Sequence, residues 1–133
     1  MILAIMYPEY YGGYYGRGLA YGRLKQFESA ISDYDKALQL NYPNPSTVYN
    51  SRATLHSNLG RYELALRDLN KVIKLNPQGD ANLSNAYYGR GMVYGNMGKY
   101  DEAERDFIKA RELGFQENIE HLLEQLNQLK TSR

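Results

Sequence analysis

The sequence predicts an all-α protein, a right-handed α-solenoid of three helix-turn-helix repeats closed by a C-terminal helix. The first observation is an internal repeat: YYGRGLAYG begins at Tyr14, YYGRGMVYG begins at Tyr87, and the weaker copy YNSRATLHS begins at Tyr49. The copies lie 35 and 38 residues apart, a period that is typical of stacked helical hairpins. The second observation is an apolar pattern of helical spacing after the third copy.

Each copy predicts two helices joined by a short turn. We expect first helices over 12–24, 46–58 and 83–96, and second helices over 27–40, 62–75 and 100–113. Gly60 and Gly98 lie between the paired helices, where a C-terminal cap is expected. Pro45 suits the first turn of a helix. Residues 78–82 hold the extra length of the 38-residue spacing, as a longer loop or as an added helical turn.

These elements divide the chain into segments. We expect repeat one over 11–43, repeat two over 44–79, repeat three over 80–115, and a C-terminal capping helix and tail over 116–133. The capping helix shows its apolar spacing in Ile119, Leu122, Leu123, Leu126 and Leu129. Such a helix covers the apolar edge of the last hairpin, as solenoids require. Residues 1–10 remain open to two interpretations, a lead-in or the remnant of a preceding helix.

Composition excludes several classes of site and partner. The 133 residues contain no Cys, which excludes disulfides, thiolate metal sites and a Cys nucleophile. The formal net charge is +1, and it is +1 up to Leu66 and 0 after it, so neither half favours nucleic acid or a membrane surface. The apolar run over 1–6 is too short to span a membrane. We expect a cytoplasmic protein with no cofactor and no metal.

The repeated residues resemble those of the tetratricopeptide repeat family. The family's opening aromatic residue, its small contact residue, and the Ala and large apolar residue of its second helix recur in register three times. In copies one to three these are Tyr14, Tyr49, Tyr87; Gly18, Ala53, Gly91; Ala30, Ala65, Ala103; and Tyr34, Leu69, Phe107. Two features depart from the pattern: His56 replaces a Tyr, and the terminating proline occurs only as Pro77, with Tyr42 and Phe115 in its place elsewhere.

The resemblance implies a protein-binding scaffold and not an enzyme. In the family the first helices line a concave groove that binds peptide segments of other proteins. The residues predicted for this groove are Tyr15, Leu19, Arg23, Asn50, Thr54, Asn58, Asn85, Tyr88, Met92 and Asn96. The alternative is a self-association module that stacks repeat edges into a homo-oligomer. A helical-repeat RNA binder is a third reading, which the near-neutral charge disfavours.

One subset of the family binds the acidic C-terminal tails of heat-shock chaperones through a set of Lys, Asn and Arg side chains called a carboxylate clamp. The matching positions here are Tyr15, Leu19, Ser51, Asn85 and Gly89, none of which carries the clamp residue. The sequence therefore predicts a partner other than these acidic tails.

An Arg and an Asp recur sixteen residues apart in every copy, as Arg17 with Asp33, Arg52 with Asp68 and Arg90 with Asp106. Each Arg precedes the small contact residue and each Asp precedes the large apolar residue, so both should lie near the seam of their hairpin. A bidentate ion pair between the paired helices is therefore expected, with a structural role. The Gly-Arg-Gly triplets lack the spacing of a phosphate loop, and we assign no catalytic residue.

Overall fold

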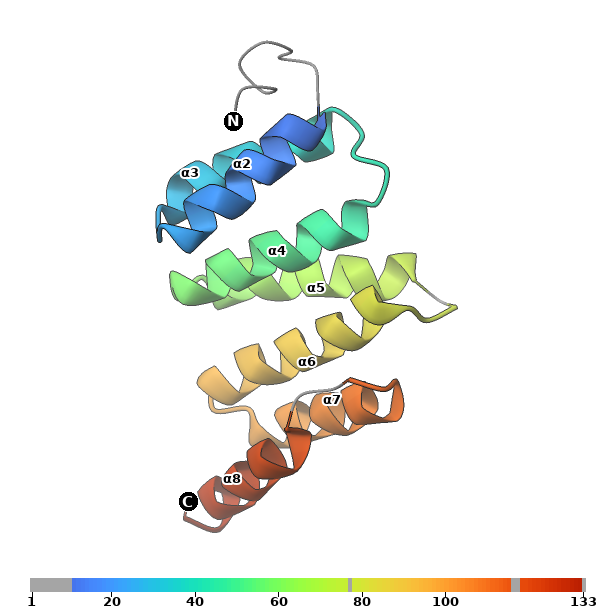
Figure 1. The fold of residues 1–133 in the computed structure, drawn as a ribbon. Helices are drawn as coiled ribbons and strands as arrows, with labels where there is room; N and C mark the ends of the chain where they lie inside the picture. The colour runs from blue at the N-terminus through green and yellow to red at the C-terminus, as the bar shows by residue number, and fades with distance from the viewer. Residues whose placement is uncertain (1–10, 77, 116–117, 133) are drawn as a thin grey trace.

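The structure, a computed structural model, describes residues 11–76, 78–115 and 118–132. These residues form seven helices, which run as three antiparallel hairpins stacked in chain order and a last helix beneath them (Figure 1). The helices are α2 (Tyr11–Arg23), α3 (Phe27–Gln39), α4 (Pro45–Asn58), α5 (Tyr62–Leu75), α6 (Ala81–Asn96), α7 (Tyr100–Glu112) and α8 (Ile119–Ser132). The predicted all-α solenoid with a closing helix is confirmed. The predicted segment 1–10 and Pro77 lie outside the described residues.

The turns within the hairpins depend on a left-handed backbone residue. Gly60 and Gly98 have φ values of 74° and 79°, which glycine adopts without the steric cost of a Cβ atom. Lys25 occupies the same place in the first hairpin and has a φ of 61°, so that turn carries some strain. The helix α6 begins at Ala81. The side chain of Asp80, the residue before it, caps the helix by accepting a 3.0 Å hydrogen bond from the main-chain N–H of Leu83. Tyr87 follows the start of α6 by six residues, whereas Tyr49 follows the start of α4 by four, so two of the three extra residues lengthen α6 at its start.

The paired helices of each hairpin meet at a seam of small residues and large partners. A Cβ atom added to Gly18 would lie 2.6 Å from the ring of Tyr34, and one added to Gly91 would lie 2.7 Å from the ring of Phe107. In the second hairpin the small residue is Ala53 and its partner is the smaller Leu69. Glycine therefore occurs opposite an aromatic ring and alanine opposite a leucine, which keeps the filled volume similar.

Successive hairpins share their apolar cores. Val48 and Leu55 of α4 pack into the core of the first hairpin, and Ala86 and Val93 of α6 pack into that of the second. After the third hairpin, α8 takes this place: its residues Ile119 and Leu126 are 3% and 4% exposed and pack against Ala103, Phe107 and Ala110. The closing helix thus covers the last apolar edge, since an uncovered edge would expose this cluster to water.

The seam predicts a compensating pair of substitutions. Gly91→Ala should lower the free energy of unfolding by about 1–3 kcal/mol, because the new methyl group overlaps the ring of Phe107. Adding Phe107→Leu recreates the Ala and Leu pair of the second hairpin, so the double variant should be more stable than the sum of the two single effects. Urea denaturation of the four proteins tests this. Strictly additive effects would contradict the seam as described.

The closing helix predicts a contrast between two leucines. Leu126→Ala should lower the free energy of unfolding by about 2–5 kcal/mol, because the side chain is 4% exposed and its removal leaves a cavity. Leu129→Ala is the matched control, since Leu129 is 45% exposed and should change stability by less than about 0.5 kcal/mol. Thermal melts followed by circular dichroism measure both. Equal effects would mean that α8 does not cover the last hairpin.

Candidate functional site

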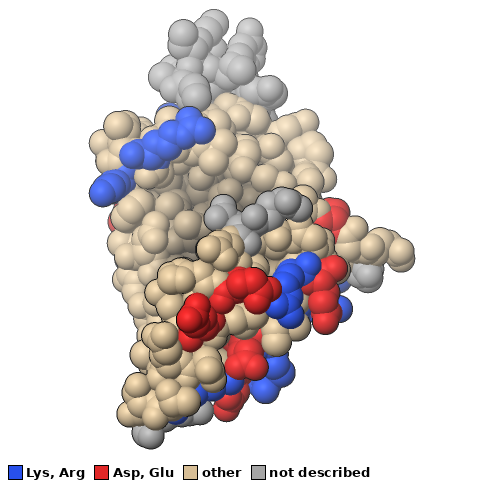
Figure 2. Space-filling view, turned by 60° about the horizontal axis from the view of Figure 1, so that its bottom comes forward, with Lys and Arg blue, Asp and Glu red and all other residues tan. Residues whose placement is uncertain are grey.

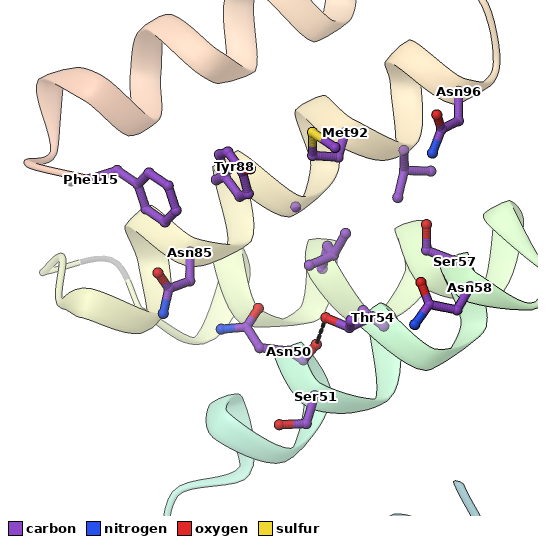
Figure 3. A pocket seen from close by; sticks show the side chains of 14 residues that line it. Asn50, Ser51, Thr54, Ser57, Asn58, Asn85, Tyr88, Met92, Asn96 and Phe115 are labelled. Atoms are coloured by element: carbon purple, nitrogen blue, oxygen red, sulfur yellow. Dashed lines mark hydrogen bonds between the residues drawn. The ribbon is translucent and has the colours of Figure 1, made fainter. Parts of the chain in front are cut away.

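An open pocket of about 460 Å³ lies between α4 and α6, the first helices of two consecutive hairpins (Figure 3). Its walls come from the exposed faces of these helices, its floor from buried residues of α4, α5 and α6, and one side from the segment after α7. The lining residues are Asn50, Ser51, Ala53, Thr54, Ser57, Asn58, Leu69, Asn85, Tyr88, Gly89, Met92, Val93, Asn96 and Phe115. Spacings of three and four residues place them on one face of each helix.

The lining is apolar at the bottom and polar at the rim. Leu69 and Val93 are 3% and 2% exposed and close the floor, whereas Thr54, Asn58 and Asn85 are exposed. Among the described residues that line the pocket, none carries a charge. In the view of Figure 2 most of the surface is free of charge, and charged side chains gather mainly over its lower half. The pocket therefore offers amide and hydroxyl groups around an apolar base.

The polar rim is fixed by hydrogen bonds between the two walls and within one of them. The Asn50 amide nitrogen Nδ2 donates to the main-chain oxygen of Asn82 at 3.1 Å, and the Asn82 Nδ2 donates to the Thr47 hydroxyl at 3.2 Å. The Thr54 hydroxyl donates to the main-chain oxygen of Asn50 at 3.2 Å. The Asn50 oxygen Oδ1 is buried and has no hydrogen-bond partner among the described residues. One acceptor at the pocket wall thus remains unsatisfied.

An aromatic pair closes one side of the pocket. The rings of Tyr88 and Phe115 are stacked, with centroids 4.2 Å apart and planes at 17°, and Tyr88 also contacts Phe107 at 5.8 Å. Sequence reasoning did not assign Phe115 to the groove. The available signal was its place in the repeat, where Tyr42 is the equivalent residue and contacts Tyr15 with centroids 4.9 Å apart.

The residues predicted for the groove divide into two groups. All those from the second and third copies line the pocket: Asn50, Thr54, Asn58, Asn85, Tyr88, Met92 and Asn96. The three from the first copy lie outside it. Tyr15 and Leu19 pack against the core of the first hairpin, and Arg23 is exposed at the end of α2. The Tyr15 hydroxyl lies 3.3 Å from the Ser51 hydroxyl, so this ring bridges α2 and α4 instead.

The repeated Arg and Asp form bidentate pairs across each seam. In the Arg17–Asp33 pair both contacts are 2.8 Å, in Arg52–Asp68 they are 2.9 and 2.7 Å, and in Arg90–Asp106 they are 2.7 and 2.8 Å. In every pair Nε and Nη2 of the guanidinium donate to the two carboxylate oxygens. The carboxylates are buried, whereas the guanidinium groups are partly exposed.

The remaining guanidinium nitrogen reaches the preceding hairpin in two copies. Arg52 Nη1 donates to Asp35 at 2.8 Å, and Arg90 Nη1 donates to Asn70 at 2.9 Å. The hydrogen bonds to the carboxylate of Asp106 raise the pKa of Arg90 above its usual value, against the opposing effect of burial. These arginines thus connect the two helices of a hairpin and also connect that hairpin to its neighbour.

Of the two histidines, His121 is exposed on α8 and His56 is buried. His56 is 8% exposed, and its Nε2 lies 4.0 Å from an oxygen of Asp68. Burial lowers the pKa of His56, so the imidazole is neutral at neutral pH. The described residues contain no group of three or more His, Asp or Glu side chains that could hold a metal ion. In the same residues no helix is long and apolar enough to cross a membrane.

The ion pairs predict unequal effects for the two partners of one arginine. Asp106→Ala should lower the free energy of unfolding by about 2–3 kcal/mol, because it leaves the partly buried guanidinium of Arg90 without its carboxylate. Asn70→Ala should cost under about 1 kcal/mol, because that contact is exposed. Urea denaturation of both variants gives the comparison. An Asp106→Ala variant as stable as Asn70→Ala would show that the pair does not hold the hairpin.

Comparisons with known proteins follow the same three-fold division. A family model described as tetratricopeptide repeat matches residues 12–41, 46–78 and 84–113. A search of the curated proteins found no match.

Solved structures with the same fold include three helical-repeat domains. The Arabidopsis OM64 TPR domain is 26% identical, with a TM-score of 0.77 over 92% of this chain and 96% of that one. The first TPR of Spaghetti (RPAP3), bound to the HSP90 peptide SRMEEVD, is 22% identical, with a TM-score of 0.80 over 91% and 93%. MamA from Desulfovibrio magneticus is 24% identical, with a TM-score of 0.82 over 96% and 70%.

Proposed function

We propose that this chain, which belongs to the tetratricopeptide repeat family, binds a peptide segment of a partner protein in the pocket between α4 and α6. Proteins of this family are interaction scaffolds rather than enzymes. The observation that carries the proposal is the pocket itself, which is open, continuous along two first helices, and lined by amides over an apolar floor.

The chemistry of the lining suits an extended peptide. An Asn side chain has both an acceptor and two donors, so it can pair with the main-chain N–H and C=O groups of a bound segment. Asn58, Asn85 and Asn96 are exposed on the two walls and available for such contacts. Tyr88 and Met92 offer apolar surface for side chains of the segment. This combination provides affinity through the backbone and selectivity through side chains.

An acidic tail is a poor fit to this pocket. The HSP90 peptide bound by the RPAP3 domain contains two Glu and one Asp in its printed sequence SRMEEVD. In the third repeat, the two positions matched to the clamp are Asn85 and Gly89. Neither is a cation, and the pocket lining holds no Lys or Arg. We therefore propose a partner other than an acidic chaperone tail.

Two substitutions in the pocket should weaken peptide binding. Tyr88→Ala removes a central aromatic contact and should cost about 2 kcal/mol or more, whereas Asn50→Ala should cost about 1 kcal/mol. The probe is a peptide selected on the intact chain from a random display library, and calorimetry measures its affinity. Asn127→Ala, an exposed amide on α8, is the matched control. Circular dichroism confirms that each variant remains helical at the temperature of the measurement.

Unchanged affinity in both pocket variants would place the binding site elsewhere on the solenoid. Light scattering over a range of concentrations examines the rival reading, self-association through repeat edges. A dimer that persists on dilution, together with no selected peptide, would favour that reading over a peptide-binding groove.

A further inference from the structure

The chemistry of this pocket also specifies what kind of segment it selects. We infer that it takes one large apolar side chain from a stretch of peptide that is uncharged at its centre, with Tyr88 and Met92 flanking that side chain. This inference rests on the proposed function, because it names the ligand class of the same site.

The floor of the pocket is built for an apolar group. Ala53, Leu69 and Val93 line the base and are 2%, 3% and 2% exposed, so the side chains at the base are aliphatic. Gly89 lies directly above Leu69, and a Cβ atom at this position would come within 3.2 Å of Leu69 Cδ2. Because Gly89 has no side chain, the pocket is deeper at this position than it would be with a larger residue. A side chain that fills this depth gains the free energy of removing its apolar surface from water.

The walls beside this floor are aromatic and adaptable. Tyr88 is held by its stack on Phe115, so its ring is a fixed wall. Met92 is 37% exposed, and its unbranched thioether can adjust to side chains of different shape. Figure 3 shows Tyr88 and Met92 on α6 and the polar residues Asn50, Thr54 and Asn58 on α4, all around the same pocket. A large apolar side chain would contact both Tyr88 and Met92 at once.

The absence of charge in the described part of the lining favours a peptide with an apolar side chain over one with a charged side chain at the same place. A charged side chain placed on this floor would lose water without gaining an ion-pair partner, since the described lining residues include no charge. The polar atoms at the rim are amide and hydroxyl groups, which match the peptide backbone. Asn50 Oδ1 adds a buried acceptor without a partner, which a main-chain N–H would satisfy after a small shift of the side chains that cover it.

Two glutamate substitutions of matched exposure provide the test. Met92→Glu introduces a carboxylate at the pocket wall, whereas Leu64→Glu introduces one on α5, at 38% exposure and outside the lining residues. The probe is a peptide selected on the intact wild-type chain from a random display library. Met92→Glu should weaken its binding about 10–100-fold, and Leu64→Glu should leave it unchanged. Replacing the large apolar residue shared by the selected peptides with Ala should weaken binding by a similar factor, and replacing it with Lys or Glu should weaken it further.

The outcomes separate this inference from the proposed function. Selected peptides that share a charged residue at their centre, or equal effects of Met92→Glu and Leu64→Glu, would overturn the apolar anchor. The proposed function would still stand in that case if Tyr88→Ala and Asn50→Ala weakened binding. A library that yields no binding peptide would overturn both.

Discussion

The close approach of two helices within each hairpin is the constraint from which the rest of the structure follows. At the first and third seams only glycine fits, because the ring of Tyr34 or Phe107 occupies the space that a Cβ atom would need. The ring is large enough to reach across the seam, so its insertion fixes both the separation and the rotation of the paired helices. The rings fix this rotation in the first and third hairpins, and Ala53 with Leu69 takes their place in the second. The first helices then form a common face, and the pocket opens between two of them.

The arginines at the same seams act on orientation rather than on volume. Each guanidinium fork matches one buried carboxylate, which sets the relative position of the two helices along their axes. Burying such a pair costs desolvation, so a hydrophobic pair could provide similar stability. An apolar pair could not also make the contact of Arg52 to Asp35 or of Arg90 to Asn70. These contacts direct the second and third hairpins onto the hairpin before them. We propose that this geometric role explains the repeat of the pair.

The sequence was sufficient for the architecture and for only part of the site. The repeat places the seam residues in register, and packing then dictates helix order, turns and the closing helix. The repeat also places Asn50 and Tyr88 on first helices, where helical spacing directs them to the inner face. Phe115 could not be assigned in this way, because it follows the last hairpin and its side chain is oriented by stacking on Tyr88. Tyr15 shows the converse: its spacing suits the groove, but its ring packs against the first core.

Selectivity in this fold is separable from stability, and the pocket shows why. The seam residues are constrained by contacts on every side, so a change at Gly91 affects the whole hairpin. Rim residues such as Asn58 and Asn96 are exposed and satisfy no packing requirement, so their identity is free to follow the ligand. In the proposed site, an uncharged rim over an aliphatic floor would disfavour a charged side chain, because desolvation without compensation opposes an ionised group there.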